Sequence, residues 1–221
     1  MTRLFTLALS ASIAVTPLPV LAQTQDHAPS DLASSSRLNH AKGEAWNYVK
    51  PGLDLARYRT VLIEDTQVYT GADAQFDNIK PADRTHFAAL LTQALRSKLA
   101  TSPGLAARAG ADVLRIKVTL LGAQKTTGGV ATAAHVMPLG FVTNAIKSVA
   151  GKRGSLTGSV LLAIEFNDAA SGELLAAAVR RAAPDALDIA ATTSTTDTVK
   201  AVADDIAEKL QKRLEKAMKP R

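Results

Sequence analysis

The chain has 221 residues, a formal net charge of +6 and no cysteine, which suits one folded domain with appendages. Without cysteine it can form neither a disulfide nor a thiolate metal site, and it lacks the residue to which a bacterial lipobox attaches lipid. A basic chain can bind nucleic acid or an anionic polymer. Aromatic residues make up only 4% of the chain, so few side chains could stack on bases, and we expect no nucleic-acid binding.

The N-terminus has the pattern of a cleavable signal peptide. Arg3 precedes an uncharged apolar stretch from Leu4 to Val20, and Val20-Leu21-Ala22 matches the small-x-small pattern before a signal-peptidase site. The alternative is an uncleaved anchor, which needs about 20 apolar residues, whereas Ser and Pro interrupt this shorter run. We therefore expect a signal peptide at 1–22, cleaved after Ala22, and a periplasmic protein, with peripheral membrane association as an alternative. Residues 23–44, rich in Ser, Ala and Asn, are expected to form a flexible leader before a single domain at 45–218.

The first half of that domain predicts a strand, a helix and a second strand. The apolar run at 60–69 indicates a strand, and Pro81 suits the first position of a helix that we expect to extend to Ala100. Residues 111–121 alternate strictly between apolar and polar side chains, which predicts a strand with one solvated face. Strand, helix and strand in this order form a crossover unit with parallel strands.

The clearest local signal is a β-hairpin from Gly158 to Arg181. Even-numbered residues from Val160 to Phe166 are apolar and would share one face, while the other face becomes polar toward the turn. Asp168, Ser171 and Gly172 supply turn chemistry, because Asp and Ser bond nearby amides and Gly accepts positive φ.

A last helix is expected to begin near Thr196 or Asp197, which would cap it, and to end near Met218, with acidic residues early and basic residues late. Together these elements predict an α+β fold. The elements follow one another in the order strand, helix, strand, insertion, hairpin, helix. The four strands form a mixed sheet, and the two long helices pack on one of its faces.

An insertion at 122–155 interrupts this order. It is rich in Gly, Ala and Thr, and its apolar residues could form a short amphipathic helix followed by basic residues. Such a helix could lie on an anionic membrane, dock a protein or cover the sheet. We prefer docking or cover, because the segment is short and Pro138 and Gly140 interrupt it. The candidate interaction surface comprises Leu139, Phe141, Val142, Ile146, Lys147, Lys152 and Arg153.

Candidate catalytic residues are scarce. No Ser-His-Asp set, metal-ligand spacing or complete nucleotide loop is present, and His135 stands alone in a Gly/Ala stretch. Glu64 and Asp65 end the first strand, where an acidic pair is either catalytic or, more commonly, a solvated strand terminus. The sequence predicts no cofactor and no enzyme activity.

Two stretches resemble a known bacterial family. They are WNYVKPGLDLARY at 46–58, with TVLI at 60–63, and the turn DAASGE at 168–173 leading into an Ala-rich strand. They are similar to the domain of unknown function 3313 family, whose members are mostly predicted envelope lipoproteins, and the resemblance covers about 46–216. This chain departs from the pattern by lacking the lipobox cysteine. The resemblance implies an envelope location and lends no catalytic residues.

We therefore expect a non-catalytic periplasmic accessory protein of the cell envelope that binds another envelope protein. The alternative is a binder of lipid or anionic envelope polymer, which would use residues 128–155 and the basic C-terminal helix.

Overall fold

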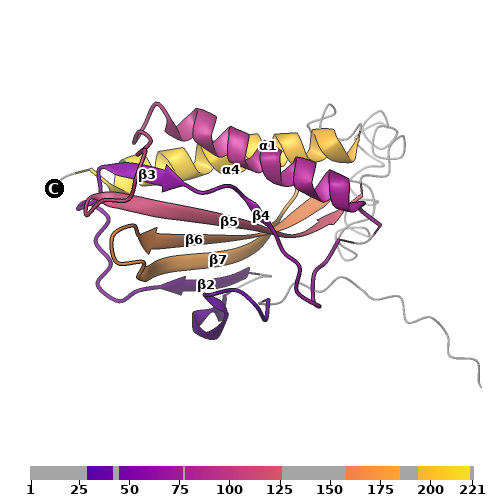
Figure 1. Ribbon diagram of the computed structural model, residues 1–221, viewed down its shortest axis with the longest axis horizontal. Coiled ribbons are helices and arrows are strands. Elements are labelled where there is room, and N and C mark those ends of the chain that lie inside the picture. The colour runs from indigo at the N-terminus through magenta and orange to yellow at the C-terminus, as the bar shows by residue number, and fades with distance from the viewer. Residues whose placement is uncertain (1–28, 42–44, 77, 126–157, 185–193, 220–221) are drawn as a thin grey trace, which may run out of the picture.

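The computed structural model describes residues 29–41, 45–76, 78–125, 158–184 and 194–219 (Figure 1). Its helices are α1 (Pro81–Leu99), α4 (Thr195–Ala217) and the short 3-10 helix η1 (Ser35–Arg37). Its strands are β1 (Asn39–Ala41), β2 (Ala45–Val49), β3 (Thr60–Ile63), β4 (Gln67–Val68), β5 (Val113–Gln124), β6 (Ser159–Asp168) and β7 (Leu174–Ala182).

The strands form one mixed sheet in the order β1-β2-β7-β6-β5-β3, and β4 pairs with β5 beyond the end of β3. β3 and β4 run parallel to β5, as the crossover predicted, and the other pairs are antiparallel. The α+β class is confirmed, but the expected four strands are wrong, because the described residues alone form a sheet of seven. The strand predicted at 60–69 breaks at Glu64–Thr66 into β3 and β4, and β1 and β2 extend the opposite edge beside β7.

The predicted hairpin is confirmed as β6 and β7, and β6 lies between β5 and β7 in the sheet. Val160 and Leu162 face the main core, whereas Leu161 and Ala163 are buried on the opposite face. Glu165 lies on the face that becomes polar toward the turn, yet it is only 6% exposed. A strand in this position is covered on both faces and therefore needs an apolar run with little alternation.

The helices α1 and α4 lie side by side on one face of the sheet (Figure 1). Each buries an apolar stripe at helical spacing in the main core. The buried residues are Phe87, Leu91, Leu95 and Leu99 of α1 and Val199, Val202, Leu210 and Leu214 of α4. The cap of α4 differs from the prediction. Ser194 is the N-cap, and its hydroxyl accepts a hydrogen bond from the Asp197 backbone N–H at 3.1 Å.

The opposite face of the sheet is covered by the segment 29–38, which we call the N-terminal strap. Leu38 is 8% exposed and packs in a second apolar cluster with Leu161 and Val179. Two amides fix the strap: Asp31 N–H donates to the Tyr69 hydroxyl at 3.1 Å, and Ser34 N–H donates to Glu165 Oε1 at 3.0 Å. Residues 29–41, within the range expected to be a flexible leader, therefore contribute η1, β1 and part of the core.

Within the described residues, no helix is both long enough and apolar enough to cross a membrane. Residues 122–124 of the predicted insertion form the end of β5, and its other residues from 126 onward lie outside the described ranges.

Candidate functional site

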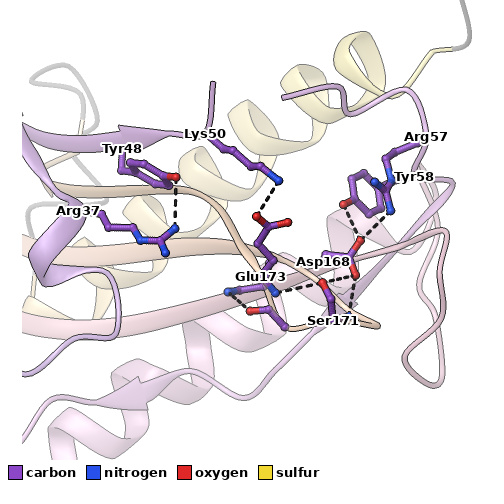
Figure 2. A network of polar contacts seen from close by, with 10 residues as sticks. Arg37, Tyr48, Lys50, Arg57, Tyr58, Asp168, Ser171 and Glu173 are labelled. Atoms are coloured by element: carbon purple, nitrogen blue, oxygen red, sulfur yellow. Dashed lines mark hydrogen bonds and ion pairs between the residues drawn. The ribbon is translucent and has the colours of Figure 1, made fainter. Parts of the chain in front are cut away.

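A buried carboxylate organises the hairpin turn. Asp168, the last residue of β6, is 5% exposed. Its Oδ1 accepts hydrogen bonds from the backbone N–H groups of Ala170 and Ser171, at 3.1 and 2.8 Å, and from the Ser171 hydroxyl at 3.0 Å (Figure 2). This is the local bonding that makes Asp a turn residue. Gly172 completes the turn at φ 76°, where a side chain would be strained.

The second oxygen of Asp168 binds the loop that follows β2. The Tyr58 hydroxyl donates to Oδ2 at 2.9 Å, and Arg57 Nη2 donates to the same atom at 3.0 Å. Tyr58 is only 1% exposed, while the Arg57 side chain is 60% exposed. Burial raises the pKa of Tyr58 to about 12, and the neighbouring Asp168 carboxylate adds to the increase.

These bonds determine the chemistry that Asp168 can perform. The hydrogen bond from the Ser171 backbone N–H, with those from Tyr58 and Ala170, outweighs burial and holds the pKa of Asp168 below its ordinary 3.8. A general base at neutral pH needs a pKa near the working pH, and a nucleophile needs a free oxygen. Asp168 has neither property, so the cluster acts as a structural tie.

The same tie explains why the two family-like stretches occur together. Besides the contacts of Tyr58 and Arg57, Lys50 Nζ pairs with Glu173 at 2.7 Å (Figure 2). The Lys50 backbone N–H also donates to Leu175 O at 2.8 Å. The stretch at 46–58 therefore docks on the turn at 168–173. Sequence reasoning named both stretches and did not connect them, since the contact joins residues 110 positions apart.

The acidic pair after the first predicted strand has structural partners, whereas His135 lies outside the described residues. Glu64 pairs with Arg115 at 3.5 Å, and Asp65 with Arg96 at 3.1 Å. His40 makes an edge-on contact with Trp46, their ring centroids 5.0 Å apart. In the described part of the chain, no three His, Cys, Asp or Glu residues are placed to hold a metal ion.

The candidate interaction surface predicted from sequence lies outside the described residues, in the range 126–157. Its members are Leu139, Phe141, Val142, Ile146, Lys147, Lys152 and Arg153.

A groove of about 770 Å³ runs between α1 and the sheet edge at β4. On the sheet side it is lined by Asp65, Thr66, Gln67 and Val68. Mostly short side chains line the helix side, which comprises Thr85, Ala88, Ala89, Thr92, Gln93, Arg96 and Ser97. Its volume is within the usual range for ligand sites, about 300–1,000 Å³. The groove exists because α1 turns small residues toward an edge strand.

Two α1 side chains already bond the backbone of this edge. Arg96 Nη2 donates to Ile63 O at 3.0 Å, and the Thr92 hydroxyl accepts from Thr66 N–H at 2.8 Å. The two backbone groups that these side chains bond lie at the end of β3 and just before β4, next to the groove. Sequence reasoning missed the groove, although one signal was available: Thr85, Ala88, Ala89 and Thr92 repeat at helical spacing.

Solved structures with a similar arrangement were found at low identity. A dodecameric variant of PelC from Paraburkholderia phytofirmans is 13% identical with a TM-score of 0.39, and the match covers 77% of this chain and 95% of that one. A neuraminyllactose-binding hemagglutinin homolog from Helicobacter pylori is 11% identical with a TM-score of 0.32, covering 80% and 88%. At such TM-scores neither likeness supports a shared role.

No curated protein matches the sequence. A family model described as "Protein of unknown function (DUF3313)" matches residues 28–210, most of the chain. The match begins next to the N-terminal strap and includes the loop at 50–58, the hairpin turn and most of α4. The chain therefore belongs to the DUF3313 family.

Proposed function

We propose that this protein is a non-catalytic accessory protein of the periplasm that binds another envelope protein. The observation that carries the proposal is the open groove between α1 and β4, which is lined mainly by methyl and methylene groups and flanked by polar ones. Apolar recesses with a few fixed polar groups are where proteins take up partners and ligands. The polar cluster around Asp168 gives no support for catalysis, because its groups bond one another.

Site-specific photo-crosslinking in cells tests this proposal. A photo-reactive amino acid replaces Gln93, an exposed groove residue, and in a control strain it replaces Lys200, an exposed residue of α4 that does not line the groove. We expect one discrete adduct from position 93, identified by mass spectrometry as an envelope protein, and none from position 200. The purified partner should then bind the mature chain, and Ala89→Trp should weaken that binding at least tenfold. The absence of a discrete adduct at position 93 would refute the proposal.

The alternative, a binder of lipid or anionic polymer, would use residues 128–155 and the basic residues of α4. On α4, Lys209 pairs with Asp205 and Lys212 with Glu208, so acidic neighbours offset part of its positive charge. Flotation with anionic liposomes tests the alternative, comparing the wild type with a variant in which Lys147, Lys152 and Arg153 are changed to Ala. Flotation of the wild type alone would favour it, and equal flotation of both, or of neither, would reject it.

A further inference from the structure

The free edge of the sheet already holds one extended segment of this chain. Beyond α1, residues Gly104–Ala106 run parallel to β3, with Leu105 opposite Val61. The Val61 N–H donates to Gly104 O at 3.0 Å, and the Ala106 N–H donates to Val61 O at 2.8 Å. The edge therefore binds an extended backbone through the N–H and C=O of a single residue, Val61.

Val68 offers the same pair of groups further along the edge. β4 is parallel to β5, and the Tyr69 N–H donates to Leu120 O at 2.9 Å. Successive residues of a strand direct their N–H and C=O to opposite sides, so those of Val68 point away from β5. Among the described residues, β4 pairs with β5 alone. An unpaired strand edge of this kind is a template for another strand.

Gln67 and Val68 both line the groove, which α1 borders on its other side. At one end Arg96 binds both Ile63 O and Asp65, and beside it Thr92 bonds Thr66 N–H. Beyond Thr92, the helix presents Ala88, Ala89 and Thr85, which contribute only short side chains opposite β4. Within the described parts of the chain, α1 therefore bonds the edge up to Thr66, and no strand pairs with its outer side at Gln67–Val68.

We propose that the groove binds an extended segment of a partner protein, which adds to the sheet as a strand parallel to β4. This inference rests on the proposed function and specifies how the partner is recognised. One residue of the segment accepts the Val68 N–H through its C=O, and the residue two positions later donates its N–H to Val68 O, as Gly104 and Ala106 do at Val61. Strand addition of this type takes affinity from the backbone and specificity from alternate side chains.

The geometry also sets the sequence preference of the segment. Every second side chain turns toward α1, where Ala88, Ala89 and Thr85 leave space, so apolar residues are favoured at alternate positions. The residue that donates to Val68 O cannot be proline, because proline has no N–H. The segment must also end, or bend away, where the Arg96–Asp65 ion pair closes the groove.

The probe is a set of peptides that bind the mature chain, selected from a displayed library of random linear sequences. We expect selected peptides to have alternating apolar residues and to shift the amide resonances of Gln67 and Val68. Ala89→Trp, which fills the groove, should weaken peptide binding at least tenfold. Ala82→Trp is the matched control, since Ala82 is exposed on α1 and does not line the groove. Both variants are first compared with wild type by circular dichroism and thermal unfolding.

Backbone methylation of the selected peptide separates strand addition from simple apolar burial. N-methylation of the amide that donates to Val68 O should weaken binding about tenfold, close to the upper value for one hydrogen bond, while methylation of the neighbouring amide should have little effect. Equal losses at both amides, a helical bound peptide, or binding insensitive to Ala89→Trp would overturn the inference. In the first two cases, the crosslink from position 93 could still appear, so partner binding and its mechanism are tested separately.

Discussion

The hydroxyl of Tyr58 donates to Oδ2 of Asp168 at 2.9 Å, and this bond joins the loop after β2 to the turn between β6 and β7. Both residues are almost fully buried, at 1% and 5% exposure. The acceptor is a charged carboxylate, and such hydrogen bonds are stronger than those between neutral groups.

Tyr58→Phe should therefore destabilise the protein. Removing one hydrogen bond to a buried charged group costs about 1.5–3 kcal/mol, which urea unfolding will measure. Tyr48→Phe is the matched control, because the Tyr48 hydroxyl accepts only a long 3.4 Å hydrogen bond from Arg37 at an exposed position, and we expect its effect to stay below about 0.5 kcal/mol. Equal losses in the two variants would contradict a specific role for the Tyr58–Asp168 bond.

Burial of Tyr58, together with its bond to Asp168, predicts a late tyrosine titration. The pKa of Tyr58 is raised from 10.0 to about 12 in the folded protein, so its contribution to stability is present below pH 10 and is lost as the pH rises toward 12. The chain has three tyrosines. Ultraviolet titration at 295 nm should show a component near pH 12 that disappears in Tyr58→Phe. A wild-type curve without this component would refute the prediction.

Asp168→Asn should be more harmful at neutral pH than in acid. The pKa of Asp168 is lower in the folded than in the unfolded chain, so the ionised carboxylate stabilises the fold above the unfolded value of about 3.9. That stability is lost as the pH falls through the folded pKa. Urea midpoints should show a smaller penalty for Asp168→Asn at pH 3 than at pH 7. Glu173→Gln removes an exposed ion pair and should cost less than about 1 kcal/mol at pH 7.

Leu38→Ala tests whether the N-terminal strap is part of the cooperative fold. Leu38 is 8% exposed in the second apolar cluster, and deleting a buried leucine side chain costs about 2–5 kcal/mol. Trp46, the one tryptophan of the sequence, packs against this cluster and reports its unfolding by fluorescence. Val49→Ala, at a side chain that is 62% exposed, should change stability by less than about 0.5 kcal/mol. Unaltered stability of Leu38→Ala would show that the strap folds independently.

Gly122→Ala should disrupt the approach of two backbone segments. A Cβ at Gly122 would lie 2.3 Å from the Gln75 carbonyl oxygen, while the Gln75 N–H donates to Leu121 O and its C=O accepts from Ala123 N–H. Such overpacking costs about 1–3 kcal/mol or more. Gly172→Ala is the comparison, because it meets open space and carries only the cost of a left-handed backbone, about 1–2 kcal/mol. A smaller loss in Gly122→Ala than in Gly172→Ala would contradict the steric argument.

The elements that could be predicted from sequence are those with a repeating apolar pattern. Helices α1 and α4, strand β5 and the hairpin each carry enough periodic residues to specify their type. Strand β6 shows the limit of this reasoning, since its sequence does not reveal that the face of Leu161 and Glu165 is covered by the N-terminal strap. The strap has no periodicity, and its position depends on contacts with Tyr69 and Glu165, far along the chain.

The groove could not be predicted from the sequence for a related reason. It is lined by two segments that are each ordinary in sequence: a two-residue strand, and a row of Ala and Thr on α1 that adjoins the buried apolar stripe of the helix. Only their pairing in space creates the recess. Only part of the network around Asp168 could be predicted from the sequence. The turn residues 168–173 were recognised, but the contacts of Tyr58 and Arg57 with them depend on the fold.

The long separation between Tyr58 and Asp168 also bears on how the chain reaches its native state. They are 110 positions apart, and β2 closes the sheet only by pairing with β7, near the C-terminal end of the chain. A chain that emerges N-terminus first cannot satisfy the buried Tyr58 hydroxyl or complete its sheet until the hairpin has followed. Contacts of such sequence separation slow folding, so the part of the sheet that contains β2 and the bond of Tyr58 forms late, after the hairpin is in place.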